Sequence, residues 1–243
     1  ILCQYLAEQL GAYLPQAGNF EGQMLPSVKQ MMRHKPWKET TQFDWSFIRT
    51  EWEKNAEGRL FIEGSPPNIM RAGKIEKYFG TDSSAILSIS SPYQQIASCL
   101  RRYEKPGFDP TKLVDQWVKK ACLIKEIQRD FPHFSLLRYE DFTSDPTLVN
   151  RLLGIPVLET NVKGKRGSGA EGIQNLASVT TLFLTEAEID AISDRLLRHV
   201  EIVALFGYSV LSGKDLIEKL LHEPDAMQKA QDRRKDWEAA HTS

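Results

Sequence analysis

The sequence predicts a single α/β domain with a mainly parallel sheet flanked by helices, and two observations lead to that class. Short apolar runs closed by turns alternate with longer segments of helical period, the order that builds parallel strands joined by crossover helices. The chain has 243 residues, of which 41% are hydrophobic, and this length and composition allow a substantial core. The sequence holds no internal repeat. We expect the domain to span residues 1–222, and residues 223–243 to form a polar peripheral helix or tail.

Composition excludes several classes of function. Lys plus Arg number 31 and Asp plus Glu 32, so the net charge of −1 leaves no broad basic field for a nucleic acid, and any anion site must be local. The three cysteines form no CxxC pair, so we expect neither a disulfide framework nor a metal site. No apolar stretch is long enough to span a bilayer and no secretory leader opens the chain, so we expect a soluble, cytoplasmic protein.

The first third of the sequence is mostly helical in pattern. Apolar residues from Ile1 to Leu14 recur on one helical face, and because no capping residue precedes them, we expect this helix to have lost its start. Further helices are expected near 25–32 and over 43–54. The run 59–63 (RLFIE), closed by Gly-Ser-Pro-Pro, predicts a buried strand entering a turn, and 68–79 predicts a helix.

The middle of the chain carries the clearest strand and helix signals. Residues 85–90 (AILSIS) predict a strand, and the capping residues that follow start a helix over 92–103. Asp109-Pro110 opens a long helix that should reach Phe131, because apolar residues repeat behind it every three or four positions. Residues 134–139 (FSLLRY) predict the third strand.

The last part of the chain predicts helices and one loop. A helix should open at Pro146, and residues 161–172, which are basic and rich in glycine and serine, should form a loop. Thr185 with Glu188 makes a capping box for a long helix that should run through Leu205 and end in Phe-Gly-Tyr.

Ligands of open α/β sheets bind beyond the carboxyl ends of the strands, which directs attention to three corners of this fold. These corners are Glu63–Asn68, Ser90–Ser98 and Tyr139–Phe142. The second joins a strand to a helix N-terminus, whose free amides favour an anion. The alternative is that Ser91 only caps the helix and Ser98 is a small surface residue.

The basic loop offers a second anion-binding element. Lys163, Lys165 and Arg166 lie among glycines, which allow close backbone approach to a phosphate, while guanidinium binds phosphate in a bidentate manner. A solvated surface loop is the alternative. The phosphate-loop pattern GxxxxGK[ST] occurs nowhere in the sequence.

Four motifs together resemble the bacterial-type sulfotransferases. They are EGSPPN at 63–68, SPYQQIAS at 91–98, RYEDF at 138–142, and a Lys-Gly loop ahead of a long helix ending in FGY. Their order and spacing match this family over residues 60–208, and four weak motifs in the right order are more specific than any one of them.

The resemblance implies a P-loop-like three-layer fold that binds 3′-phosphoadenosine 5′-phosphosulfate (PAPS) and transfers its sulfuryl group to a hydroxyl or amine of a small-molecule, glycan or lipid acceptor. It also implies that a strand and a phosphate-binding loop precede the helix at residue 1, so we expect the chain to begin just after that loop. The positions that the resemblance assigns to the nucleotide are Ser90 and Ser98 at the 3′-phosphate, Tyr139 near adenine, and Lys163, Gly164 and Arg166 in the loop covering the 3′-phosphate.

Two departures from the family pattern suggest an alternative function. Gly64 stands where the family usually has Lys, and Ser90 stands where it usually has Arg. The first removes a cation near the transferring sulfuryl group and the second removes a bidentate contact to the 3′-phosphate. The alternative is therefore a nucleotide-binding relative or interaction module without transfer activity. A nucleotide kinase is disfavoured, because no acidic metal-binding strand end stands out.

Sulfuryl transfer needs one base to accept the acceptor's proton. Glu63 is placed best, at a strand end, although a buried carboxylate there can equally hold a neighbouring loop. The other candidates for the base are His34, Asp44 and Glu51, and Trp37, Trp45 and Trp52 either line an acceptor pocket or belong to the core.

Overall fold

The computed structural model describes residues 1–17, 20–32, 42–80, 83–159, 173, 176–221 and 225–241. Its residues separate into two compact units. Unit 1 comprises Ile1–Leu87, Ile127–Leu137 and Asp141–Gln174, and unit 2 comprises Ser88–Glu126, Arg138–Glu140 and Asn175–Ser243.

A two-stranded parallel sheet contains the only strands of the described residues. The strands are β1 (Ile86–Ile89) and β2 (Ser135–Arg138), and both expected strands at these positions are confirmed. They are joined through helices α5 (Pro92–Tyr103) and α6 (Lys112–Asp130), the crossover that a parallel pair requires. The chain is thus mixed α/β, with a sheet smaller than we expected.

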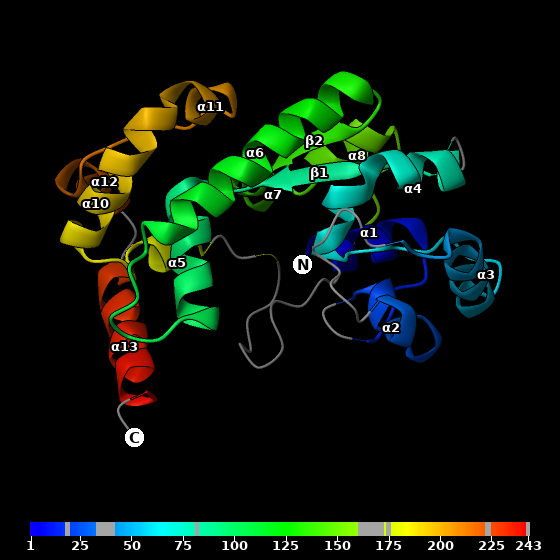
Figure 1. The fold of residues 1–243 in the computed structure, drawn as a ribbon, viewed down its shortest axis with the longest axis horizontal. Coiled ribbons are helices and arrows are strands. Elements are labelled where there is room, and N and C mark those ends of the chain that lie inside the picture. Colours follow the sequence, from blue (N-terminus) through cyan, green and yellow to red (C-terminus); the bar gives the residue numbers. More distant parts are fainter. Residues whose placement is uncertain are drawn as a thin grey trace. The chain divides into compact units, whose positions relative to one another are not determined.

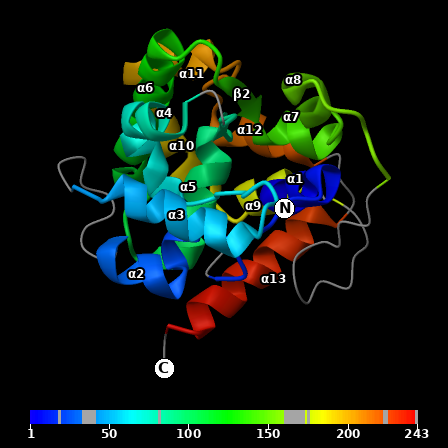
Figure 2. The ribbon, with the colours of Figure 1, turned by 90° about the vertical axis from the view of Figure 1, so that its right-hand side faces the viewer.

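Unit 1 is built mainly from short helices. Its elements are α1 (Leu2–Leu10), α2 (Pro26–Met32), α3 (Trp45–Ala56), α4 (Ala72–Phe79), most of α7 (Tyr139–Ser144), α8 (Leu148–Leu153) and the 3-10 turns η1 (Gly22–Met24) and η2 (Pro66–Arg71). Helices α2 and α3 pack side by side (Figures 1 and 2). Asp44 caps α3 by accepting a hydrogen bond from the Phe47 amide at 3.0 Å.

The segment 59–63 is not the buried strand that we expected. It forms one isolated parallel bridge between Tyr13 and Phe61, in which Tyr13 N–H donates to Leu60 at 2.7 Å and Ile62 N–H donates to Tyr13 at 2.9 Å. Leu60 is 50% exposed, and only a few extended residues follow α1 to pair with this segment. The prediction of a strand over residues 59–63, which relied on apolar composition alone, is therefore wrong.

Unit 2 contains most of the longer helices. The elements of unit 2 are α5, most of α6, α9 (Ala177–Thr181), α10 (Glu186–Leu196), α11 (Val200–Leu205), α12 (Gly213–Leu220) and α13 (Ala226–Ala239), with the 3-10 turn η4 (Leu197–His199) between α10 and α11. The capping box at Thr185 and Glu188 is confirmed. The expected continuous helix through Leu205 is wrong, because the 3-10 turn η4 interrupts it, although the buried face continues from Leu196 to Val203.

The polar C-terminal segment contains a packed helix. Helix α13 contacts α9, beside which it runs in Figure 2, and it buries Ala226, Ala230 and Trp237. Arg234 on the same helix pairs with Glu188 at 2.7 Å, and both side chains are 20% exposed. Three apolar contacts and one partly buried ion pair therefore anchor a segment whose composition is mostly polar.

Candidate functional site

Helix α5 begins directly beyond β1 and provides the first part of the site. The Ser91 hydroxyl accepts a hydrogen bond from the Gln94 amide at 3.2 Å, and Pro92 occupies the first helical position. The Ser90 carbonyl accepts a hydrogen bond from Trp117 Nε1 at 3.0 Å. Ser91 thus acts as a helix cap, and Ser90 lies at the corner where the sequence predicts an anion.

An internal carboxylate lies at this helix N-terminus. Glu140 accepts hydrogen bonds from the Ser91 amide and from the Tyr208 hydroxyl, each at 2.8 Å. Burial, followed by the negative charge of Glu140, raises the pKa of Tyr208, so the phenol stays protonated and keeps donating. Because Glu140 takes the position that favours an anion, a ligand phosphate fits better farther along α5 than at its first turn.

The second part of the site lies on one face of α5 about two turns from its start. Ser98 and Arg102 are four residues apart and share this face, and the side chain of Arg102 is exposed. Burial, followed by the negative charge of Glu140, raises the pKa of Tyr139, and the positive charge of Arg102 opposes them. Arg102 therefore shares a helical face with Ser98 and acts electrostatically on Tyr139, two residues that the sequence assigned to one nucleotide.

A second cation lies beside the same face. Lys120 of α6 donates a hydrogen bond to Gln95 Oε1 at 3.4 Å, and burial lowers the pKa of its ammonium group. Burial raises the pKa of the Cys99 thiol, while Lys120 and Arg102 oppose that effect. Among the residues with described positions, neither cation forms a salt bridge, although the charges of Glu104 and Glu140 also act on Cys99 and Tyr139.

Glu63, the candidate base, belongs to unit 1 and is held by three donors. Its Oε1 accepts hydrogen bonds from the Ser65 amide at 2.7 Å and Asn68 Nδ2 at 3.1 Å, and its Oε2 accepts one from the Gly22 amide. Burial raises the pKa of Glu63 to about 7, although these hydrogen bonds act in the opposite direction. The carboxylate thus joins the turn at 64–68 to the segment at Gly22, the structural role that we considered as its alternative.

The neighbouring Gly64 is closely packed. A Cβ atom at this position would lie 2.9 Å from Cys3 Sγ and 3.1 Å from the Phe20 carbonyl oxygen. Any larger side chain would have to displace one of these neighbours. The absence of the lysine that the family usually has here therefore coincides with a lack of space for it.

Three of the remaining candidates for base and acceptor pocket have structural roles. Asp44 is the cap of α3, and Trp45 and Trp52 are core residues with 2% and 6% exposure. The ring of Trp52 stacks on Phe61 with centroids 5.2 Å apart. Glu51 is half-buried on α3. His34 and Trp37 lie outside the described residues, as do Lys163, Gly164, Lys165 and Arg166 of the basic loop.

Comparison with protein-family models, curated proteins and solved structures found no match to this chain. Within the described part of the chain, no group of three or more histidine, cysteine or acidic side chains could hold a metal ion, and no helix has the length and apolarity to cross a membrane. The sequence assigned no role to Glu140. It lies two residues after β2, within the Tyr139–Phe142 corner that the sequence had singled out, and that place was the signal that could have pointed to it.

Proposed function

We propose that the chain binds a 3′-phosphorylated adenine nucleotide and acts as a PAPS-dependent sulfotransferase with a P-loop-like three-layer architecture. In this proposal the 3′-phosphate lies along α5, with adenine near Tyr139, and the loop containing Lys163, Gly164 and Arg166 covers it. The acceptor supplies a hydroxyl or amine. The motif order of the sequence supports the family, and the α5 face supports the nucleotide.

The observation that carries the proposal is the position of Arg102. This cation shares a helical face with Ser98, and its charge partly offsets the effects of burial and of Glu140 on Tyr139. A hydroxyl, a guanidinium and an aromatic ring provide a hydrogen bond and a charged fork for phosphate, and a surface for a base. In this arrangement Arg102 supplies the positive charge that Ser90 lacks.

Transfer would be an in-line displacement in which the protein positions the reactants and neutralises charge on the sulfuryl oxygens. A base with a pKa near 7 suits removal of a proton from the acceptor at neutral pH, and Glu63 has that pKa. Its two oxygens already accept three hydrogen bonds, so it would have to exchange one of them for the acceptor.

The second candidate function is nucleotide binding without transfer. The packing around Gly64 favours it, because no cation can be added there without displacing Cys3 or Phe20. A protein with the α5 face and no cation at that turn would bind the nucleotide but stabilise little of the charge that develops in transfer.

Binding is tested by isothermal titration calorimetry with 3′-phosphoadenosine 5′-phosphate (PAP) and with AMP, which lacks the 3′-phosphate. We expect Arg102→Ala to weaken PAP binding by about tenfold to a hundredfold, since a charge-assisted hydrogen bond contributes about 1.5–3 kcal/mol. AMP binding should change much less. Lys119→Ala, which removes an exposed cation from α6, is the control. Equal losses for both nucleotides, or no PAP binding by the unmodified chain, would contradict the proposal.

Transfer is tested separately with PAP and 4-nitrophenyl sulfate, by following release of 4-nitrophenolate. Release that requires PAP and falls strongly in Glu63→Gln supports the sulfotransferase. PAP binding that depends on Arg102, without release from this or other aryl sulfates and without consumption of PAPS, supports the binding protein instead.

A further inference from the structure

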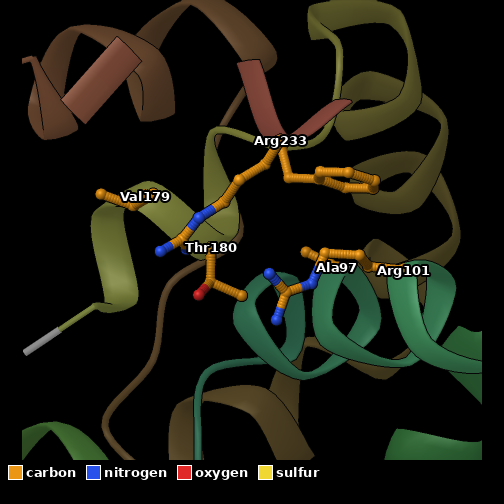
Figure 3. Close-up of a pocket in the computed structure, with 6 residues that line it drawn as sticks. Ala97, Arg101, Val179, Thr180 and Arg233 are labelled. Atoms are coloured by element: carbon orange, nitrogen blue, oxygen red, sulfur yellow. The ribbon is translucent and has the colours of Figure 1, made fainter. Parts of the chain in front are cut away.

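A small hollow lies on the neighbouring face of α5, within unit 2. Its lining residues are Ala97 and Arg101 of α5, Val179 and Thr180 of α9, Phe183 just beyond α9, and Arg233 of α13. As the side chains stand, the space between them is too small to hold a water molecule, and it opens to solvent at its mouth. Figure 3 shows the side chains of Arg101 and Arg233 extending toward Thr180. Two guanidinium groups and one hydroxyl thus meet at one small opening.

The charges at this opening are all of one sign. Burial lowers the pKa of Arg101, and the positive charges of Arg233 and Arg102 lower it further. Within the described residues, neither Arg101 nor Arg233 has a carboxylate within salt-bridge distance, and Thr180 Oγ1 has no hydrogen-bond partner. Two partly buried cations that face each other repel, which costs stability unless an anion neutralises them.

The packing of α13 fixes where Arg233 lies. The next residue, Arg234, donates to the Phe183 carbonyl at 3.1 Å and to Glu188 at 2.7 Å, and the ring of Trp237 packs edge-on against Phe183 at 5.3 Å. Arg234 therefore uses the available carboxylates, while Arg233 faces the hollow without one. The packing of α13 therefore fixes the backbone position from which Arg233 extends.

We propose that a tetrahedral dianion, a phosphate or sulfate group, binds at the solvent-facing mouth of this hollow, in contact with Arg101, Arg233 and Thr180. Guanidinium forks and a hydroxyl donate to oxygens that lie in several directions, which suits such an anion. The hollow is separate from the proposed nucleotide face, because consecutive helical residues are about 100° apart around the axis, and Ala97 and Arg101 each precede by one the residues Ser98 and Arg102. The inference thus goes beyond the proposed function.

The test titrates the chain with inorganic phosphate and with sulfate, at an ionic strength held constant with chloride, and follows heat and thermal unfolding. We expect saturable binding, and at least a tenfold rise in Kd in both Arg101→Gln and Arg233→Gln. Lys235→Gln, an exposed cation on the same helix, should bind as the unmodified chain does. Without an anion, Arg233→Gln should melt at the same or a higher temperature than the unmodified chain, because the repulsion is gone.

Thr180→Val keeps the shape of the side chain and removes only the hydroxyl, so it serves if an arginine variant does not fold. We expect it to raise the Kd for phosphate at least threefold. The proposal is overturned if phosphate and sulfate stabilise the chain no more than chloride does. It is equally overturned if Arg101→Gln, Arg233→Gln and Thr180→Val all bind these anions as Lys235→Gln does.

A competition experiment distinguishes a free anion from the phosphate of the nucleotide. For a separate site, Arg102→Ala should weaken PAP binding yet change the Kd for phosphate less than twofold, and saturating phosphate should leave PAP binding in place. Displacement of PAP by phosphate, with both lost in Arg101→Gln, would overturn the separate site. Phosphate binding that depends on Arg101 in a chain that binds no PAP would support this inference while the proposed function fails.

Discussion

The buried carboxylate of Glu63 makes a quantitative prediction about stability and pH. Its pKa is raised by burial to about 7 in the folded chain, from 4.5 in an exposed glutamate. Between these two values the folded state keeps a proton that the unfolded state has lost, so the free energy of unfolding falls as pH rises. At about 1.4 kcal/mol per pH unit, this interval corresponds to a loss of about 3 kcal/mol.

The perturbation is Glu63→Gln, which cannot ionise. In the variant an amide NH2 replaces one carboxylate oxygen, and this NH2 faces another donor, either the Gly22 amide or the pair at Ser65 and Asn68. We therefore expect the free energy of unfolding of the variant to be about 1–3 kcal/mol lower than that of the unmodified chain at pH 4.5. The unmodified chain should lose its advantage over the variant as pH rises toward 7, and the difference should level off above pH 8.

Urea unfolding at pH values from 4.5 to 8.5 measures this difference, with tryptophan fluorescence as the probe because Trp45 and Trp52 are buried in unit 1. Glu57→Gln makes the same chemical change at an exposed position and should show no such convergence. The reasoning is refuted if the difference between the unmodified chain and Glu63→Gln stays constant across the range, or if it grows with pH.

Two further predictions concern packing and ion pairs. Gly64→Ala should lower the free energy of unfolding by about 1–3 kcal/mol, because its Cβ would meet a sulfur atom at 2.9 Å, whereas Gly73→Ala meets only a ring carbon at 3.5 Å and should change it by less than about 1 kcal/mol. Thermal melts that rank the two variants in the opposite order would contradict the described packing. Arg234→Ala should cost about 1–3 kcal/mol, and Arg195→Ala, whose pair with Asp115 is more exposed, less than about 1 kcal/mol. Similar losses in chemical denaturation would show that burial of the Arg234 pair contributes little.

Local sequence signals predicted elements whose hydrogen bonds are also local. The cap at Ser91, the proline after it and the apolar period behind it predicted α5 over 92–103, and its bounds are those residues. The capping box at Thr185 and Glu188 succeeded for the same reason, because it joins atoms only three residues apart. The strand at 59–63 failed, since pairing depends on a partner that the run itself does not contain.

The candidate sites show the same division. The sequence by itself determined that Ser98 and Arg102 share a helical face, because helix geometry fixes that spacing. Only the tertiary structure decided that Glu140, 49 residues beyond Ser91, occupies the N-terminus of α5, and that Arg233 faces Arg101 across a small hollow. Electrostatic and hydrogen-bonding partners that are far apart in the chain meet because apolar faces pack together. Many apolar residue types satisfy that packing equally well, so the local sequence does not reveal which distant residues will meet.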